Sequence, residues 1–366
     1  MDILRRANER AAAGGDVLHL EVGQPSTGAP AAVLAAAHEA LDGETLGYTE
    51  ALGLPALRET IARHYRDYYA ISVPPGRIAV TTGSSAGFIL AFLAAFEPGD
   101  RVALAAPGYP AYRNILAALG IEPVELAVGA ESRFQPTVAD LEAAGPLAGL
   151  IVASPANPTG TVLSREALGL IAQHCRANGI RLISDEIYHG IGYGPAITSA
   201  LVLTHEAVVI NSFSKYFSMT GWRIGWMVMP EELVRPVECL AQNLFISPPS
   251  LAQLAAVAAF GCRAELDRNV ARYAENRAIL LQGLPEAGLD SLAPADGAFY
   301  VYADVGRFTN DSEAFCRRLL AETGVAITPG VDFDRERGHR LVRLSFAGST
   351  ETVARAVDRI GPFLRR

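Results

Sequence analysis

The chain has 366 residues, of which 50% are apolar and 19% are charged, a composition typical of a folded globular protein. This length exceeds what one small core supports, so we expect two domains, or one large domain with a smaller lobe. The net charge of −8 gives no reason to expect nucleic acid or an anionic membrane as a partner.

No targeting or membrane-spanning segment is predicted. The first residues, MDILRRANERAAAGG, carry arginine and glutamate and have no apolar signal core. The apolar runs at 86–96 and 251–260 are too short to cross a bilayer. Four cysteines are scattered without a CxxC pair or metal-ligand spacing, namely Cys175, Cys239, Cys262 and Cys316. We therefore expect reduced thiols, no metal site and a cytoplasmic location.

Short β-rich runs alternate with helix-period runs from about residue 76 to residue 229. Strands are predicted at Ile78–Thr82, Arg101–Ala105, Leu150–Ala153, Arg181–Ser184, Val208–Asn211 and Ile224–Met229, with helices at 84–96, 110–119 and 164–178. This alternation predicts an α/β fold with a mostly parallel sheet and helices on both faces. Ligands of such sheets bind beyond the carboxyl ends of the strands. Candidate polar groups follow these ends at Gly83-Ser84, Ser154–Gly160, Asp185 and Ser212–Lys215.

After Pro230 the pattern predicts long helices to about residue 283 and then a second, smaller α+β unit. Its strands are expected at Ala298–Val305, Val325–Thr328 and Arg340–Phe346, and its helices at Ser312–Thr323 and 350–364. The resulting division is an N-terminal segment (1–35) that packs with the small domain, a large cofactor-binding domain (36–265) and a small C-terminal domain (266–366). The ligand site is expected between the two bodies.

Lys215 is the only lysine in the chain, although lysine and arginine together number 31. An amine can lose its proton and attack a carbonyl, whereas the pKa of a guanidinium is too high for this. A lysine near a strand end could therefore form an imine with an aldehyde cofactor. The alternative is an ordinary exposed lysine in an arginine-rich sequence.

Two motifs after buried strands carry groups that suit a pyridine ring. Asp185 ends an apolar run, and a carboxylate there must be paired. A protonated pyridine nitrogen would pair with it and stay cationic as an electron sink. Tyr188 and Asn157 could donate to a phenolic oxygen of the same ring. The alternatives are a helix cap for Asp185 and a simple turn for Asn-Pro-Thr-Gly.

A strand-to-helix loop, Thr81-Thr-Gly-Ser-Ser-Ala-Gly87, suits an anion because helix N-termini present free N–H groups. Phosphate ligands could be Ser84, Ser85, Ser212 and Arg223. Neither GxGxxG nor GxxxxGK[ST] is present, which disfavours a dinucleotide or P-loop nucleotide. Tyr109 could stack on a flat ring or simply pack under its loop.

Arg343 lies within the apolar strand Leu341-Val-Arg-Leu-Ser-Phe346 and needs an anionic partner. A substrate carboxylate fits the bidentate geometry of guanidinium. An internal salt bridge is the alternative.

Together these motifs resemble the class I/II aminotransferases, which are fold-type-I enzymes of the aspartate aminotransferase superfamily that use pyridoxal 5′-phosphate. The resemblance covers nearly the whole chain. It also includes Gly23 in Glu-Val-Gly-Gln-Pro, Gly47-Tyr48-Thr49 followed by Gly53 and Leu57-Arg58, Pro107–Tyr109 and Pro329-Gly330.

The resemblance implies a role for each residue. Lys215 would hold the cofactor as a Schiff base and move the proton, Asp185 would pair with the pyridinium nitrogen, and Tyr188 and Asn157 would bond the ring oxygen. Tyr109 would stack on the ring.

The implied phosphate ligands are Ser84, Ser85, Ser212 and Arg223. Tyr48 would reach the phosphate of the neighbouring subunit, which implies a homodimer with shared active sites. Gly23, Asn157 and Arg343 would contact the substrate.

The implied reaction is ping-pong transfer of an amino group from an L-amino acid to a 2-oxo acid. Aspartate-specific members have a second arginine from across the dimer, and no residue here is assigned to that role. The stretch Phe245–Leu251 is expected near the pocket. The sequence does not identify the amino acid donor or the 2-oxo acid acceptor. Two alternatives also remain: a carbon–sulfur β-lyase and a non-catalytic regulatory protein that binds the same cofactor.

Overall fold

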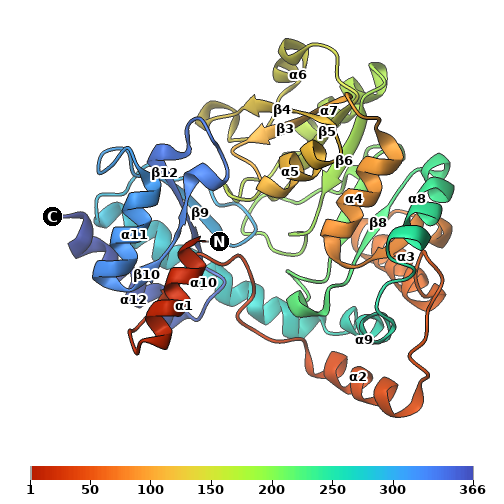
Figure 1. Ribbon diagram of the computed structural model, residues 1–366, viewed down its shortest axis with the longest axis horizontal. Helices are drawn as coiled ribbons and strands as arrows, with labels where there is room; N and C mark the ends of the chain where they lie inside the picture. Colours follow the sequence, from red (N-terminus) through yellow and green to blue (C-terminus); the bar gives the residue numbers. More distant parts are fainter. Residues whose placement is uncertain (1, 366) are drawn as a thin grey trace.

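The computed structural model describes residues 2–365, which form a larger and a smaller body joined side by side. Figure 1 shows the larger body built around the central sheet and the smaller one built from the C-terminal strands and helices together with α1. No helix among the described residues combines the length and apolarity needed to cross a membrane. No cluster of His, Cys, Asp and Glu within residues 2–365 could hold a metal ion.

The central sheet has seven strands in the order β2-β8-β7-β6-β5-β3-β4. They are β2 (Ile78–Thr81), β3 (Arg101–Ala106), β4 (Glu122–Ala127), β5 (Gly149–Ala153), β6 (Arg181–Asp185), β7 (Val208–Ser212) and β8 (Gly225–Val228). Only β8 runs antiparallel to its neighbours β2 and β7. The predicted α/β class with a mostly parallel sheet is confirmed. The edge strand β4 was not predicted, because its sequence Glu-Pro-Val-Glu-Leu-Ala buries only one residue fully.

Helices cover both faces of this sheet. They are α2 (Ala31–Gly43), α3 (Pro55–Tyr69), α4 (Gly83–Ala95), α5 (Pro110–Ala118), α6 (Val138–Ala144), α7 (Arg165–Ala177), α8 (Glu231–Leu244) and α9 (Ser250–Ala259). One core packs α3, α7 and α9 against the sheet, and a second core packs α4, α5 and α8 against the other face. Because both faces are covered, the strands read as apolar runs rather than as alternating patterns.

The smaller body contains a three-stranded antiparallel sheet, β11-β12-β9. Its elements are α10 (Arg263–Glu286), β9 (Tyr300–Asp304), α11 (Ser312–Thr323), β10 (Val325–Ala326), β11 (Thr328–Pro329), β12 (Leu341–Ser345) and α12 (Thr350–Leu364). The single strand predicted at Val325–Thr328 was wrong. It divides at Ile327, because β10 pairs with the N-terminal strand while β11 pairs with β12.

The N-terminal segment lies on the smaller body. Strand β1 (Leu18–His19) pairs in parallel with β10, and α1 (Asp2–Ala12) buries Ile3 and Ala7 beside α11 and β10. The Arg10 side chain donates to the Ala321 carbonyl at 3.0 Å. The domain boundaries at residues 35 and 265 themselves stay a prediction.

Candidate active site

A cleft of about 620 Å³ lies at the carboxyl ends of the central strands and is also lined by residues of the smaller body and of the N-terminal segment. Most of the predicted site residues line it: Gly23, Ser84, Ser85, Tyr109, Asn157, Asp185, Tyr188, Lys215, Arg223 and Arg343. The cleft therefore brings together predicted site residues that are up to 320 positions apart in the sequence, from Gly23 to Arg343.

Lys215 follows β7 and reaches across the cleft to the N-terminal segment. Its Nζ donates to the Gly23 carbonyl at 2.7 Å. Burial and, to a smaller extent, the Arg343 cation lower the pKa of the Lys215 amine to about 8, while the negative charge of Asp185 opposes this fall. A larger share of this amine than of an ordinary lysine is therefore neutral and nucleophilic near pH 7.

Asp185 is the last residue of β6 and is fully enclosed. Burial raises the pKa of its carboxyl to about 6, while the hydrogen bond from Tyr112, the Ile187 N–H and the Lys215 charge oppose this rise. Tyr112 donates to Oδ2, and Ile187 N–H donates to Oδ1 at 3.0 Å. The residues after Asp185 form a turn rather than a helix, so the helix-cap alternative was wrong.

Arg343 and Asn157 contact each other on one wall of the cleft. The Arg343 guanidinium donates to Asn157 Oδ1 at 2.9 Å and to the Glu21 carbonyl at 2.6 Å. It lies 4.4 Å over the Tyr300 ring, and its buried Nε has no partner. No carboxylate among residues 2–365 forms an ion pair with it, so the salt-bridge alternative was wrong.

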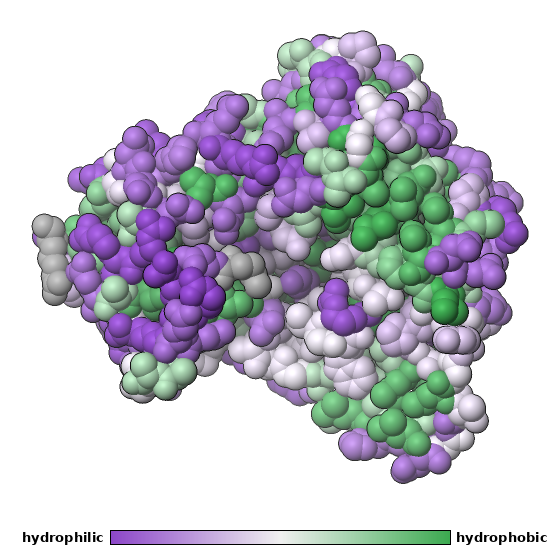
Figure 2. Space-filling view, viewed as in Figure 1, coloured by the Kyte–Doolittle hydropathy of each residue, from purple (hydrophilic) through white to green (hydrophobic). Residues whose placement is uncertain are grey.

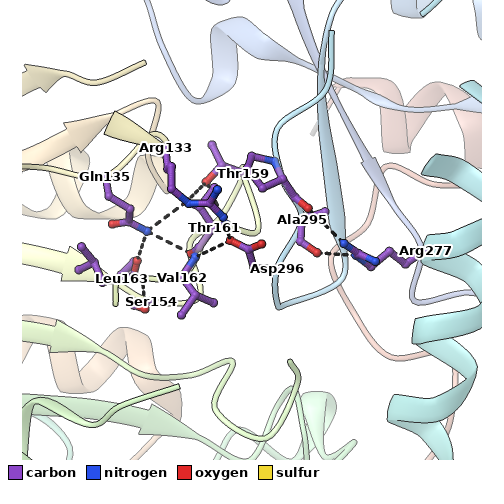
Figure 3. A network of polar contacts seen from close by, with 12 residues as sticks. Arg133, Gln135, Ser154, Thr159, Thr161, Val162, Leu163, Arg277, Ala295 and Asp296 are labelled. Atoms are coloured by element: carbon purple, nitrogen blue, oxygen red, sulfur yellow. Dashed lines mark hydrogen bonds and ion pairs between the residues drawn. The ribbon is translucent and has the colours of Figure 1, made fainter. Parts of the chain in front are cut away.

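A polar network holds the Asn157 loop against the smaller body (Figure 3). Asp296, just before β9, accepts from Arg133 at 2.5 Å and from the Val162 N–H at 3.4 Å. Gln135 donates to the carbonyls of Ala153 and Thr161, both at 3.1 Å. These hydrogen bonds fix both ends of the turn, at Ala153 and at Thr161, and the position of Asn157 between them follows.

The first turn of α4 forms a cationic, N–H-rich corner with Arg223. Gly83 begins the helix with φ +73°, and a Cβ there would lie 2.3 Å from Arg223 Nη2. Arg223 donates to the Thr220 carbonyl at 3.0 Å and forms no ion pair with any described carboxylate. Ser84 and Ser85 line the cleft beside it.

Three predicted positions lie outside the lining of the cleft. The Ser212 hydroxyl is buried and accepts from the Ser214 N–H at 3.1 Å, and Ser214 lines the cleft instead. Tyr48 is 82% exposed on the surface. Of the stretch Phe245–Leu251, Pro249 and Leu251 line a neighbouring cavity that shares Gln24 and Thr220 with the cleft.

The chain matches the family Aminotransferase class I and II over residues 15–360. It belongs to this family.

A valine–pyruvate aminotransferase of Mycobacterium tuberculosis is 55% identical over 100% of this chain and 95% of its own length. The crystal structure of an aminotransferase from the same organism superposes with a TM-score of 0.98 at 55% identity, covering 100% of this chain and 96% of that one. The Thermus thermophilus aspartate aminotransferase with maleate has a TM-score of 0.94 at 33% identity and covers 99% and 95%.

The protein is thus a pyridoxal-phosphate-dependent aminotransferase, as predicted, and the donor groups of its cleft suit that cofactor. The corner at Gly83 and Arg223 offers an anion site without a protein anion in it. Asp185 offers a buried carboxylate for a protonated ring nitrogen, and Lys215 offers an amine of lowered pKa for the aldehyde. The phosphate, the ring nitrogen and the aldehyde of pyridoxal phosphate are therefore each matched by a complementary group in the cleft.

Sequence reasoning missed Tyr112, Tyr300 and Ser214 in the aminotransferase cleft. Tyr112 lies three residues after Tyr109 on α5, so helical spacing could have placed it on the same face. Tyr300 comes from the smaller body, where its hydroxyl lies 2.7 Å from that of Tyr188. No local pattern predicts this pairing, because 112 positions separate the two residues.

Proposed function

We propose that Lys215, Asp185 and Tyr188 are the catalytic residues of this aminotransferase. Lys215 would hold the cofactor through its aldehyde group, and the Nζ of Lys215 would also move the substrate's α-proton. The observation that carries this proposal is the buried Lys215 amine with a pKa of about 8, which forms no ion pair at 4 Å or less with a described carboxylate and lies in the same cleft as the buried Asp185 carboxyl.

Pyridoxal phosphate, when bound, supplies the electron sink that makes the α-proton of an amino acid acidic. Asp185 keeps the ring nitrogen protonated through its negative charge. Tyr188 and Asn157 orient the ring oxygen, and Tyr109 covers the ring face. Ser84, Ser85 and Arg223 line the cleft and hold the phosphate, and Ser212, whose hydroxyl lies behind Ser214, is a further proposed ligand.

Arg343 binds the substrate α-carboxylate, and Asn157 holds the guanidinium in place. The hydrogen bonds of Arg343 support this role. Its buried guanidinium donates to neutral oxygens only, and its Nε has no partner. A carboxylate would complete its coordination bidentately. Gly23 lines the cleft and contacts the substrate; only glycine fits there, because a Cβ would lie 2.0 Å from the Tyr300 hydroxyl oxygen.

The substrate side chain is uncharged. The cations that line the cleft are Lys215, Arg223, Arg343 and Arg317, and Arg317 lies 3.8 Å from Glu313. Asp2, Glu21, Glu313 and Asp332 also line the cleft, so a second substrate carboxylate would have acidic neighbours and no cation there that is free of an assigned partner. The 55% identical relative is named a valine–pyruvate aminotransferase, which supports a small aliphatic donor and a small 2-oxo acid acceptor.

The active form is a homodimer in the cytoplasm, with Tyr48 completing the partner's phosphate site. Apolar side chains gather on the surface over α2 (Figure 2), and the exposed ones in and near this helix are Leu34, Leu41 and Leu46. Tyr48 follows them at 82% exposure. The cytoplasmic location is supported by four free cysteines. Division at residues 35 and 265 is supported by separate cores in the two bodies.

A stopped-flow spectral screen of the pure holoenzyme against single amino acids tests the reaction and the substrate class together. Valine and alanine are expected to convert the cofactor to its amine form faster than aspartate does, and Lys215→Ala is expected to abolish conversion. A faster reaction with aspartate would contradict the proposed side-chain class. Full turnover by Lys215→Ala would contradict the catalytic assignment.

Mixing two variants tests the shared site. Subunits with Tyr48→Phe are expected to be weakly active and subunits with Lys215→Ala to be inactive. Their heterodimers contain one site with both natural residues, so refolding the mixture should restore activity. Unchanged low activity in a mixture with proven heterodimers would rule out the role of Tyr48.

A further inference from the structure

The hydroxyl of Tyr300 lies between two groups that face the cofactor site, and no role is assigned to it above. Tyr300 is the first residue of β9 and is 1% exposed. Its hydroxyl oxygen lies 2.7 Å from that of Tyr188. It also lies against Gly23, because a Cβ on that glycine would be 2.0 Å away. Since the Gly23 carbonyl accepts from Lys215 at 2.7 Å, the smaller body places one hydroxyl beside both Tyr188 and the support of Lys215.

Packing fixes the position of the Tyr300 ring. The rings of Tyr188 and Phe299 meet it at steep angles, with centroids 5.6 Å and 5.0 Å away. The Arg343 guanidinium lies over its face, 4.4 Å from the centroid. Because the ring is enclosed by these groups, its hydroxyl oxygen stays beside that of Tyr188, and only the hydroxyl hydrogen is free to rotate.

The two hydroxyls carry two protons, but the hydrogen bond between them uses only one. Burial raises the pKa of Tyr188 well above its usual value and also raises that of Tyr300, so both phenols are protonated at neutral pH. Either oxygen could be the donor. If Tyr188 donated to Tyr300, it would present only lone pairs to the cleft and could not donate to a ring oxygen. If Tyr300 donates, the O–H of Tyr188 is available for that oxygen.

We propose that Tyr300 is a positioning residue, which donates its hydroxyl proton to Tyr188 and thereby directs the Tyr188 O–H at the ring oxygen of pyridoxal phosphate. This inference rests on the proposed role of Tyr188. Two hydrogen bonds in series polarise one another, so the bond from Tyr300 also strengthens the bond from Tyr188 to the ring oxygen.

The surroundings of Tyr300 favour it as the donor. Within residues 2–365 its hydroxyl has no hydrogen-bond partner other than Tyr188. As an acceptor it would leave its own hydrogen buried without a described partner, which is unfavourable. The Arg343 cation on the ring face opposes the rise in the pKa of Tyr300, and it makes the O–H a stronger donor for the same reason.

The absorption spectrum of the holoenzyme reports how strongly the ring oxygen is hydrogen-bonded. Lys215 is joined to the cofactor aldehyde through its nitrogen, and the spectrum changes when that nitrogen gains or loses a proton. Negative charge on the neighbouring ring oxygen favours the protonated nitrogen, and a hydrogen bond donated to this oxygen reduces the effect. A weaker bond from Tyr188 should therefore move the midpoint of the spectral change to higher pH.

Absorbance titrations of the holoenzyme test the proposal. Tyr300→Phe keeps the ring that packs against Arg343 and removes only the hydroxyl. One bond in series strengthens the next by roughly 10 to 30%, so the midpoint is expected to rise by about 0.1 to 0.7 pH units. Tyr302→Phe is the matched control, because Tyr302 is also 1% exposed on β9 and its hydroxyl has no partner. It should keep the wild-type midpoint.

A double-mutant cycle separates an effect through Tyr188 from a general one. Tyr188→Phe should itself raise the midpoint, and adding Tyr300→Phe to it should cause no further shift. An equal shift in both backgrounds would overturn the proposal, as would an unchanged midpoint in Tyr300→Phe or an equal rise in Tyr302→Phe. If Tyr188→Phe leaves the midpoint in place, the proposed role of Tyr188 fails and this inference fails with it. A shift in Tyr188→Phe alone would refute only the role of Tyr300.

The phenol C–O stretching bands provide a second measurement that does not require Tyr300→Phe to fold. A phenol that only donates absorbs at a different frequency from one that donates and accepts. In the infrared difference between the wild-type holoenzyme and Tyr188→Phe, both with ¹³C-labelled tyrosine, the band lost with Tyr188 is expected to be that of a phenol that donates and accepts. The band of a phenol that only donates would contradict the proposed direction.

Discussion

The hydrogen bond from Tyr112 to Asp185 offers a direct test of how the carboxylate is kept ionised. Burial alone raises the pKa of Asp185, and the Tyr112 hydroxyl is the largest contribution that opposes the rise to about 6. A hydrogen bond to a charged group contributes about 1.5 to 3 kcal/mol, and one pKa unit corresponds to about 1.4 kcal/mol. Tyr112→Phe should therefore raise the pKa of Asp185 by about 1 to 2 units.

The direction of the pH dependence follows from the protonation state in which Asp185 binds the cofactor. Only ionised Asp185 pairs with a protonated ring nitrogen, so the affinity of the cofactor-free protein for pyridoxal phosphate should rise with pH through the pKa of Asp185. Equilibrium dialysis across pH 5 to 9 should show the acid side of this curve displaced by about 1 to 2 pH units in Tyr112→Phe. The titration of free pyridoxal phosphate is common to both proteins and cancels in the comparison.

A suitable control is Tyr302→Phe, which removes a buried hydroxyl that has no partner. It should leave the curve in place, because no hydrogen bond to Asp185 is lost. Coincident curves for wild type and Tyr112→Phe would refute the reasoning, since the hydroxyl would then not stabilise the charge on Asp185.

Three further outcomes are expected. Because the Lys215 amine has a pKa of about 8, the rate at which cofactor-free protein captures pyridoxal phosphate should rise about tenfold per pH unit up to pH 8 and then level off, and a rise continuing past pH 10 would contradict this. Gly83→Ala should weaken pyridoxal phosphate binding, measured by dialysis, because its Cβ would meet Arg223 at 2.3 Å; Gly99→Ala has a comparable φ of +92° but open space and should bind normally. Arg343→Lys should lower kcat/KM for amino acids about 100-fold through loss of bidentate binding, and an unchanged kcat/KM would exclude Arg343 as the carboxylate ligand.

Local sequence determined the elements that carry the site. The helices at Ser312–Thr323 and 350–364 were predicted with the bounds that the structure has, because their apolar period and caps are encoded within each segment. The strand ends that present Ser84, Asn157, Asp185 and Lys215 could also be predicted, since buried parallel strands are short apolar runs followed by polar turns. The single lysine was visible by counting.

Only the tertiary structure determined which residues from distant parts of the chain are in contact. The Tyr188–Tyr300 contact, the hydrogen bond from Arg343 to Asn157 and the hydrogen bond from Lys215 to Gly23 all join the two bodies or the N-terminal segment across more than 100 positions. The division of 325–328 into two strands has the same origin, because its two halves take partners from opposite ends of the chain. Hydrophobic periodicity describes one segment at a time, whereas the charge state of a buried amine or carboxyl depends on every group that the fold brings against it.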